Sequence, residues 1–133
     1  AMAGRAFDWL RQAERDLQQA LSSQELGYYE WACFASHQAA EKAVKALHLF
    51  MGQEAWGHVV AKLLLELPIS VPEPLVEKGK VLDGYYIPPR YPNGFPEGAP
   101  FEHFGSLQAK EAVSYAREII EFVRAQMAEE RRG

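Results

Sequence analysis

Four polar side chains between residues 37 and 48 are spaced so that they share one side of a helix. At intervals of four, four and three residues, they are His37, Glu41, Lys45 and His48. Side chains three or four residues apart are neighbours on a helix surface, and imidazoles beside a carboxylate and an ammonium group can perform acid–base chemistry or bind a ligand. The same spacing also suits a solvated flank with an ordinary Glu41–Lys45 ion pair. Spacing alone favours the solvated flank.

A second candidate site lies in the stretch YYIPPRYPNGFP, residues 85–96. It holds four prolines, four aromatic residues and a single cation, Arg90. A guanidinium group can bind phosphate or carboxylate with two parallel hydrogen bonds, and aromatic rings can stack on nucleobases. The stretch therefore suits a nucleotide or an unstacked RNA base. In the alternative interpretation, which stays open here, the aromatic rings fold back onto the helices and Arg90 pairs with Asp83 or Glu41.

Other residue types that carry chemistry are sparse. The one cysteine, Cys33, lies in an apolar stretch that favours packing over reactivity. The four histidines are widely spread and form no His-Glu-x-x-His motif, so no metal site is predicted. His58 follows Gly57 at the expected start of a helix. There it would make a cap-region contact or act as a neutral proton acceptor, because a helix N-terminus disfavours imidazolium.

The elements that would position these residues are helical. Apolar residues recur at helical spacing in five segments, and no strand pattern occurs: 6–22, 28–51, 57–67, about 72–86, and from Ser106 onward. We therefore predict an all-α fold, an antiparallel up-and-down bundle of three long and two shorter helices with a long proline- and aromatic-rich loop. Segment 28–51 is apolar on two sides, which places it at the bundle centre or at a subunit interface. Residues 1–5 and 129–133 are expected to be disordered.

Length and charge narrow the function. A chain of 133 residues is one domain's worth. The formal net charge of −4 argues against a general DNA-binding face, because such faces need many cations. No apolar run approaches the length of a membrane span, and no signal-peptide core is seen, so we expect a cytoplasmic protein without a membrane partner.

Three ordered blocks resemble the HEPN domain (higher eukaryotes and prokaryotes nucleotide-binding). They are YYEWACFASHQAAEKAVKALHLFMG, the pair GH, and LDGYYIPPRYPN, followed by a final amphipathic helix; the resemblance covers roughly residues 6–126. It implies an up-and-down helical bundle, usually a homodimer, which in small prokaryotic members is often encoded beside a minimal nucleotidyltransferase as a toxin–antitoxin-like pair. Carried onto this chain, the polar residues of interest are Gln38, Glu41, Lys42, Lys45, His58, Asp83, Tyr86, Arg90 and Tyr91.

The chain departs from many HEPN ribonucleases, whose motif is an Arg followed four to six residues later by His. No arginine of this chain has a histidine at that spacing. The expectation is therefore a dimeric nucleotide- or RNA-binding protein without confident catalytic residues, cofactor or metal. One alternative is a metal-independent endoribonuclease that uses Arg90 with His58 or His37, because RNA cleavage needs a base and a cation for the phosphorane charge. Another is a pure protein-interaction module without ligand.

Overall fold

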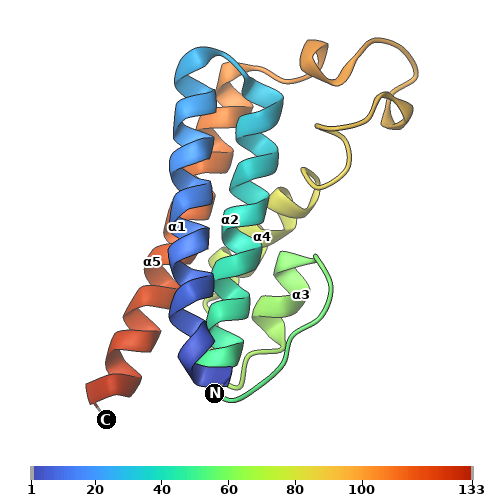
Figure 1. Ribbon diagram of the computed structural model, residues 1–133. Helices are drawn as coiled ribbons and strands as arrows, with labels where there is room; N and C mark the ends of the chain where they lie inside the picture. Colours follow the sequence, from blue (N-terminus) through green and yellow to red (C-terminus); the bar gives the residue numbers. More distant parts are fainter. Residues whose placement is uncertain (1, 133) are drawn as a thin grey trace.

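The computed structural model describes the backbone of residues 2–132 and the side chains of residues 4–128. Over this range the chain is helical and contains no strand, which confirms the predicted all-α bundle (Figure 1). Its elements are α1 (Met2–Leu26), α2 (Tyr29–Phe50), α3 (Val60–Leu65), α4 (Glu73–Asp83), the 3₁₀ turns η1 (Pro92–Gly94) and η2 (Pro100–Glu102), and α5 (Ser106–Arg132).

Two glycines set the limits of the central helix. Gly27 and Gly52 both have positive φ angles, 85° and 78°, a conformation that glycine adopts without steric cost. The first closes the α1–α2 turn, in which the Tyr28 amide donates to the Ser23 carbonyl at 2.8 Å. The second follows the last turn of α2. Both ends of α2 are thus defined by local sequence.

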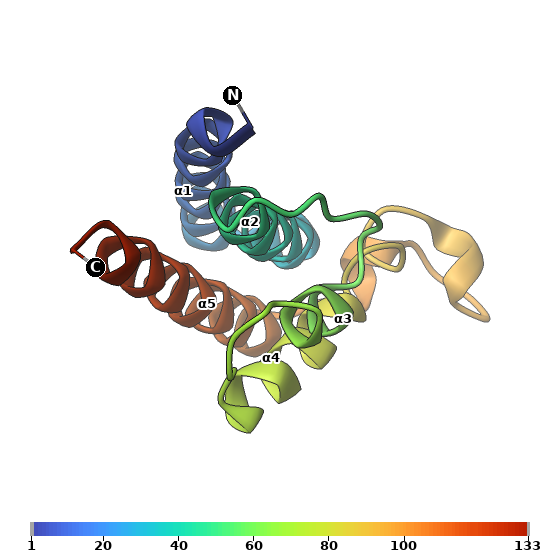
Figure 2. The same ribbon diagram turned by 90° about the horizontal axis from the view of Figure 1, so that it is seen from below.

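Helix α2 is the centre of the bundle. It runs antiparallel to α1, which covers one side of it, and α3, α4 and α5 lie together on the opposite side (Figures 1 and 2). Trp31 is the one exposed residue of α2. Apart from Trp31, both apolar sides of this helix therefore face protein, which agrees with the bundle centre, the first of the two predicted positions.

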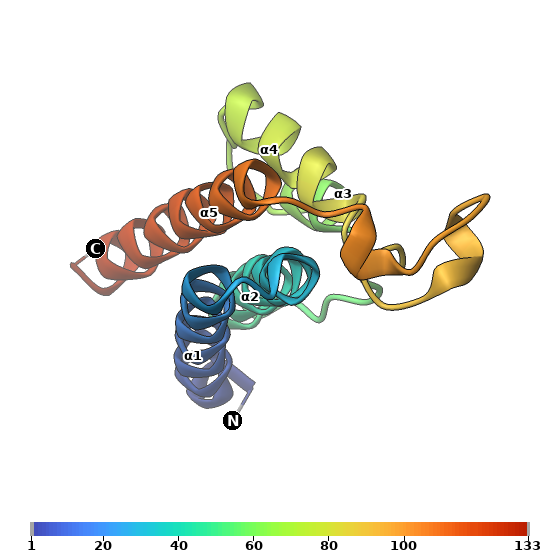
Figure 3. The ribbon, with the colours of Figure 1, turned by 90° about the horizontal axis from the view of Figure 1, so that it is seen from above.

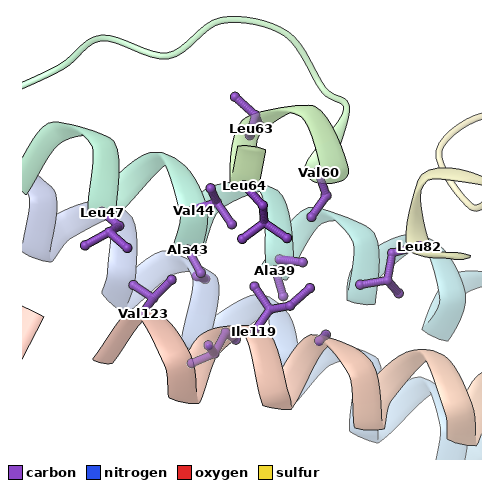
Figure 4. Packing of buried hydrophobic residues seen from close by; sticks show 14 of the residues in the cluster. Ala39, Ala43, Val44, Leu47, Val60, Leu63, Leu64, Leu82, Ile119 and Val123 are labelled. Carbon is purple, nitrogen blue, oxygen red and sulfur yellow. The ribbon is translucent and has the colours of Figure 1, made fainter. Parts of the chain in front are cut away.

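The core forms where α2, α3 and α5 meet (Figure 4). Small side chains such as Ala39 and Ala43 let Ile119 and Val123 of α5 approach α2 closely, and all four are fully buried. Helix α3 contributes Leu64 and its neighbours to the same cluster. Each large aliphatic side chain buried in this way stabilises the fold by about 1.5–3 kcal/mol.

Several helix limits differ from those predicted. The third helix begins at Val60 instead of residue 57, because Gly57 takes a positive φ of 90° and the side chain that caps the helix comes from another element, as described below. The fourth ends at Asp83 instead of about residue 86. Helices α1 and α5 reach Met2 and Arg132, beyond their predicted ends. Of the residues predicted to be disordered, 1 and 133 lie outside the described part.

Gly79 is a position of close helix contact. A Cβ atom at this site would lie 3.3 Å from atoms of Val60, Ala61 and Leu64 of α3. We predict that Gly79→Val destabilises the protein by about 1–3 kcal/mol through overpacking. Urea unfolding followed by circular dichroism measures the change. Gly4→Val is the control, because Gly4 is also helical but has no atom within 4 Å of the added Cβ; equal losses in the two variants would contradict the prediction.

Candidate functional site

The polar row of α2 is buried, so the solvated-flank interpretation is wrong. His37, Glu41 and His48 are 0%, 5% and 2% exposed, and the Lys45 side chain is also largely covered. Burial arises because the segments around α3 and after α4 fold over this side of α2, which spacing along one helix does not reveal. Buried polar groups need partners, and each of the three has them.

Glu41 joins two segments that are far apart in sequence. Its two carboxylate oxygens accept hydrogen bonds from Lys45 Nζ and from His58 Nδ1, each at 3.0 Å. The His58 side chain is half-exposed, at 54%. With Nδ1–H donating to the carboxylate, Nε2 is the acceptor nitrogen whenever the ring is neutral. Glu41 thus fixes the orientation and tautomer of an accessible imidazole.

Asp83, at the end of α4, caps the N-terminus of α3. Its carboxylate accepts from the backbone amides of Val60 at 2.6 Å and Ala61 at 3.0 Å, two donors that a helix start otherwise leaves without partners. Buried His37 lies 3.3 Å from the same carboxylate, and its Nε2–H donates to the His58 carbonyl at 2.8 Å. Asp83 and His37 therefore hold α3, α4 and the His58 loop against α2.

Arg90 is held in an aromatic nest. Its Cζ lies 4.3 Å from the ring centroid of Phe34, 4.7 Å from that of Tyr86 and 5.2 Å from that of Tyr91, all within cation–π range. Its Nε donates to the Tyr86 carbonyl at 2.7 Å. His58 stacks on the Tyr86 ring at 4.8 Å. Tyr86 is therefore a shared contact that brings Arg90 and His58 into one site.

The charges of the site differ in how they are neutralised. Lys42 pairs with Asp16 at 2.5 Å and Lys45 with Glu41 at 3.0 Å. Among the described residues, Arg90 has no carboxylate within ion-pair distance. The expected alternative pairings of Arg90 with Asp83 or Glu41 are thus not formed. Within the described part of the chain, its two terminal amino groups have no hydrogen-bond partner, and the residue is partly exposed.

The rest of the aromatic loop packs on itself. Phe95 stacks on His103 with ring centroids 4.1 Å apart, and the His103 Nε2–H donates to the Glu97 carbonyl at 2.7 Å. Phe104 contacts Tyr85 and Phe95 edge-on. This part of the chain projects away from the helices (Figure 3). The loop therefore serves two roles: its first part builds the Arg90 nest, and its second part is an ordered arm.

Sequence reasoning selected most of the residues that meet here. Glu41, His58, Tyr86 and Arg90 come together, whereas Lys42 lies on the side of α2 that faces α1. Phe34 was missed. Its position three residues before His37 on the same helix was a usable signal.

Cys33 is buried, and burial raises the pKa of its thiol from 9.0 to about 12. The folded state keeps its proton where the unfolded chain loses it, so we predict that the free energy of unfolding falls as pH rises from about 9 toward 12. Urea midpoints across this range measure the slope. In Cys33→Ala, the fall of the unfolding free energy with pH should be shallower. Part of the fall should remain, because burial also raises the pKa of Tyr85 to about 12. An unchanged slope in the variant would contradict this role.

Within residues 4–128, no group of three or more His, Cys, Asp or Glu side chains could hold a metal ion. Among the described helices, none is long and apolar enough to cross a membrane.

The fold combines a hairpin of α1 and α2 with the long helix α5, and the loop after α4 places Arg90 against α2. The family model for the HEPN domain matches residues 6–126, and the chain belongs to this family. Among curated proteins none matches.

Three crystal structures are similar to this chain. TT1696 from Thermus thermophilus shares 53% identity at a TM-score of 0.90, covering 91% of this chain and 97% of its own. ST0689, an archaeal HEPN homologue, shares 42% sequence identity at a TM-score of 0.81. The match covers 92% of this chain and 98% of that protein. A HEPN domain protein from Thermotoga maritima shares 36% sequence identity at a TM-score of 0.75. The match covers 91% of this chain and 98% of that protein.

Proposed function

We propose that this HEPN protein binds a nucleotide or an RNA end through Arg90 and does not cleave it. The observation that supports this most is the state of the Arg90 guanidinium, which is fixed by three rings and one carbonyl and is not neutralised by any carboxylate of the described residues. Phosphate is the anion that a guanidinium group recognises best in two-point contacts. Tyr86 and Tyr91 frame the phosphate site, and His58 lies beside it.

The stiffness of the loop supports the same role. Pro88 and Pro89 restrict the backbone before Arg90, and the Arg90 amide donates to the Ile87 carbonyl at 3.0 Å in a tight turn. An arginine held in place before the ligand arrives loses less side-chain entropy on binding than a mobile one. This organisation favours a binding site over incidental packing.

The wider context is part of the proposal. The protein acts as a homodimer together with a separately encoded minimal nucleotidyltransferase, in a toxin–antitoxin-like pair in the cytoplasm. The support is the family membership and the absence of the Arg-x4–6-His pattern from the sequence. An adjacent nucleotidyltransferase reading frame, and co-purification of its product with this chain, test this part independently of ligand binding.

The second candidate function is a metal-independent ribonuclease. It is favoured by the Glu41–His58 pair, in which a carboxylate orients an accessible imidazole next to the Arg90 nest. His58 would accept the proton of a 2′-hydroxyl and Arg90 would stabilise the phosphorane charge. His37 is a weaker base candidate because it is fully buried and its Nε2–H already donates to the His58 carbonyl.

Two measurements separate these functions. Calorimetric titration with nucleoside monophosphates and short RNA should give heat for at least one ligand, and incubation with total RNA in EDTA should give no cleavage. Cleavage that disappears in a folded Arg90→Ala variant would instead establish the ribonuclease. No heat from any ligand, with a tight protein partner, would establish a pure interaction module.

A further inference from the structure

We propose that the hollow between α1 and α2 is a nucleobase site, which takes the base of the nucleotide whose phosphate Arg90 holds. The hollow has a volume of about 540 Å³, inside the range of about 300–1,000 Å³ found for small-molecule pockets. The proposal rests on the phosphate role of Arg90 proposed above. It adds a second contact region, which shares Phe34 with the Arg90 site.

Aromatic residues in the first turns of α2 and just before it form one wall of the hollow. Tyr28, Trp31 and Phe34 all line it. Trp31 is 48% exposed and Tyr28 57%, although large aromatic side chains are usually well buried in a folded chain. Trp31 contacts Phe34 edge-on, with ring centroids 6.2 Å apart. An accessible indole next to further rings is a suitable stacking surface for a base.

Phe34 connects this wall to the phosphate site. The same ring that lines the hollow lies 4.3 Å from Cζ of Arg90. A nucleotide whose phosphate binds the guanidinium would place its base against Trp31, because the Phe34 ring contacts both Arg90 and Trp31. The position of Phe34 between the two regions also favours a nucleotide over a second copy of the chain as the occupant. A nucleotide supplies both an anion for the Arg90 guanidinium and a flat ring for the apolar surface.

The polar side of the hollow suits an uncharged ligand part. Lys42 and Asp16 line it but neutralise each other at 2.5 Å. Gln19 and Gln38 line it as well, and their amide nitrogens donate to Ser23 at 2.9 Å and to His37 at 3.3 Å. Their carbonyl oxygens remain as acceptors. A base with an exocyclic amino group, such as adenine, offers the matching donor.

The experiment compares AMP with ribose 5-phosphate in calorimetry, because ribose 5-phosphate has a hydroxyl group in place of the base. Wild-type protein should bind AMP about tenfold or more tightly than ribose 5-phosphate, which is the expected effect of one stacked base. Trp31→Ala should lose this difference and keep its affinity for ribose 5-phosphate. Trp31→Phe should retain most of the difference, because a ring remains. Trp56→Ala is the control, since Trp56 is 79% exposed and does not line the hollow.

The outcomes distinguish this proposal from the one on which it rests. If Arg90→Ala abolishes AMP binding and Trp31→Ala leaves it unchanged, the base site is overturned and the phosphate role stands. If Arg90→Ala changes neither affinity, the phosphate role fails as well. If Trp31→Ala converts a dimer into a monomer in light scattering, with AMP affinity unchanged, the hollow is a subunit contact and the base site is overturned.

Discussion

Asp83→Ala is expected to lower the free energy of unfolding by about 2–4 kcal/mol. The substitution leaves the backbone amides of Val60 and Ala61 without their acceptor, and both residues are buried. Each unsatisfied buried donor costs about 1–3 kcal/mol, and loss of a helix cap costs about 0.5–2 kcal/mol. His37 also loses its neighbouring carboxylate. Urea unfolding followed by circular dichroism measures the loss.

Two variants control this prediction. Asp83→Asn keeps one side-chain oxygen as an acceptor, so it should lose less than Asp83→Ala. Asp8→Ala removes an exposed carboxylate that pairs with Arg5 and Arg11, and exposed pairs contribute about 0–1 kcal/mol. If Asp83→Ala is no less stable than Asp8→Ala, the cap does not hold α3 in place.

Glu41→Ala is expected to destabilise the protein by about 2–3 kcal/mol. The variant deprives Lys45 Nζ and His58 Nδ1 of their common partner. Removing one member of a buried pair costs about 3–5 kcal/mol, and we reduce this figure because His58 is half-exposed and can turn toward water. Thermal and urea unfolding measure the change.

The comparison for Glu41 uses a helix carboxylate at the surface. Glu118 accepts from Lys78 at 2.7 Å but is 42% exposed, so Glu118→Ala should cost no more than about 1 kcal/mol. Glu41→Gln keeps an acceptor oxygen for one of the two donors and should fall between wild type and Glu41→Ala. Equal stability of Glu41→Ala and Glu118→Ala would contradict the buried network.

The sequence predicted the helices well because their signals are local. The apolar repeat of α5, with Ile120 and Val123 on one stripe, and the glycine after α2 depend only on neighbouring residues. The helix starts were predicted less well. The cap of α3 comes from Asp83, 23 residues after Val60, and no local pattern contains that information.

The candidate site was predicted only in part for a related reason. Arg90 and Tyr86 stand out within one unusual stretch of sequence, and His58 was selected as well. That Glu41 orients His58 depends on how the loop after α2 returns to the helix, which spacing does not specify. The same folding buries His37, so the polar residues of α2 that were predicted to be solvated lie beneath the site instead.

The most direct test of the central claim is the dissociation constant of one nucleoside monophosphate for wild type, Arg90→Ala and Arg117→Ala. Arg117 is an exposed arginine of α5 and serves as the matched control. Charge-assisted hydrogen bonds contribute about 1.5–3 kcal/mol, so Arg90→Ala should weaken binding at least about tenfold while Arg117→Ala leaves it unchanged. Equal affinities in all three proteins would contradict a phosphate site at Arg90.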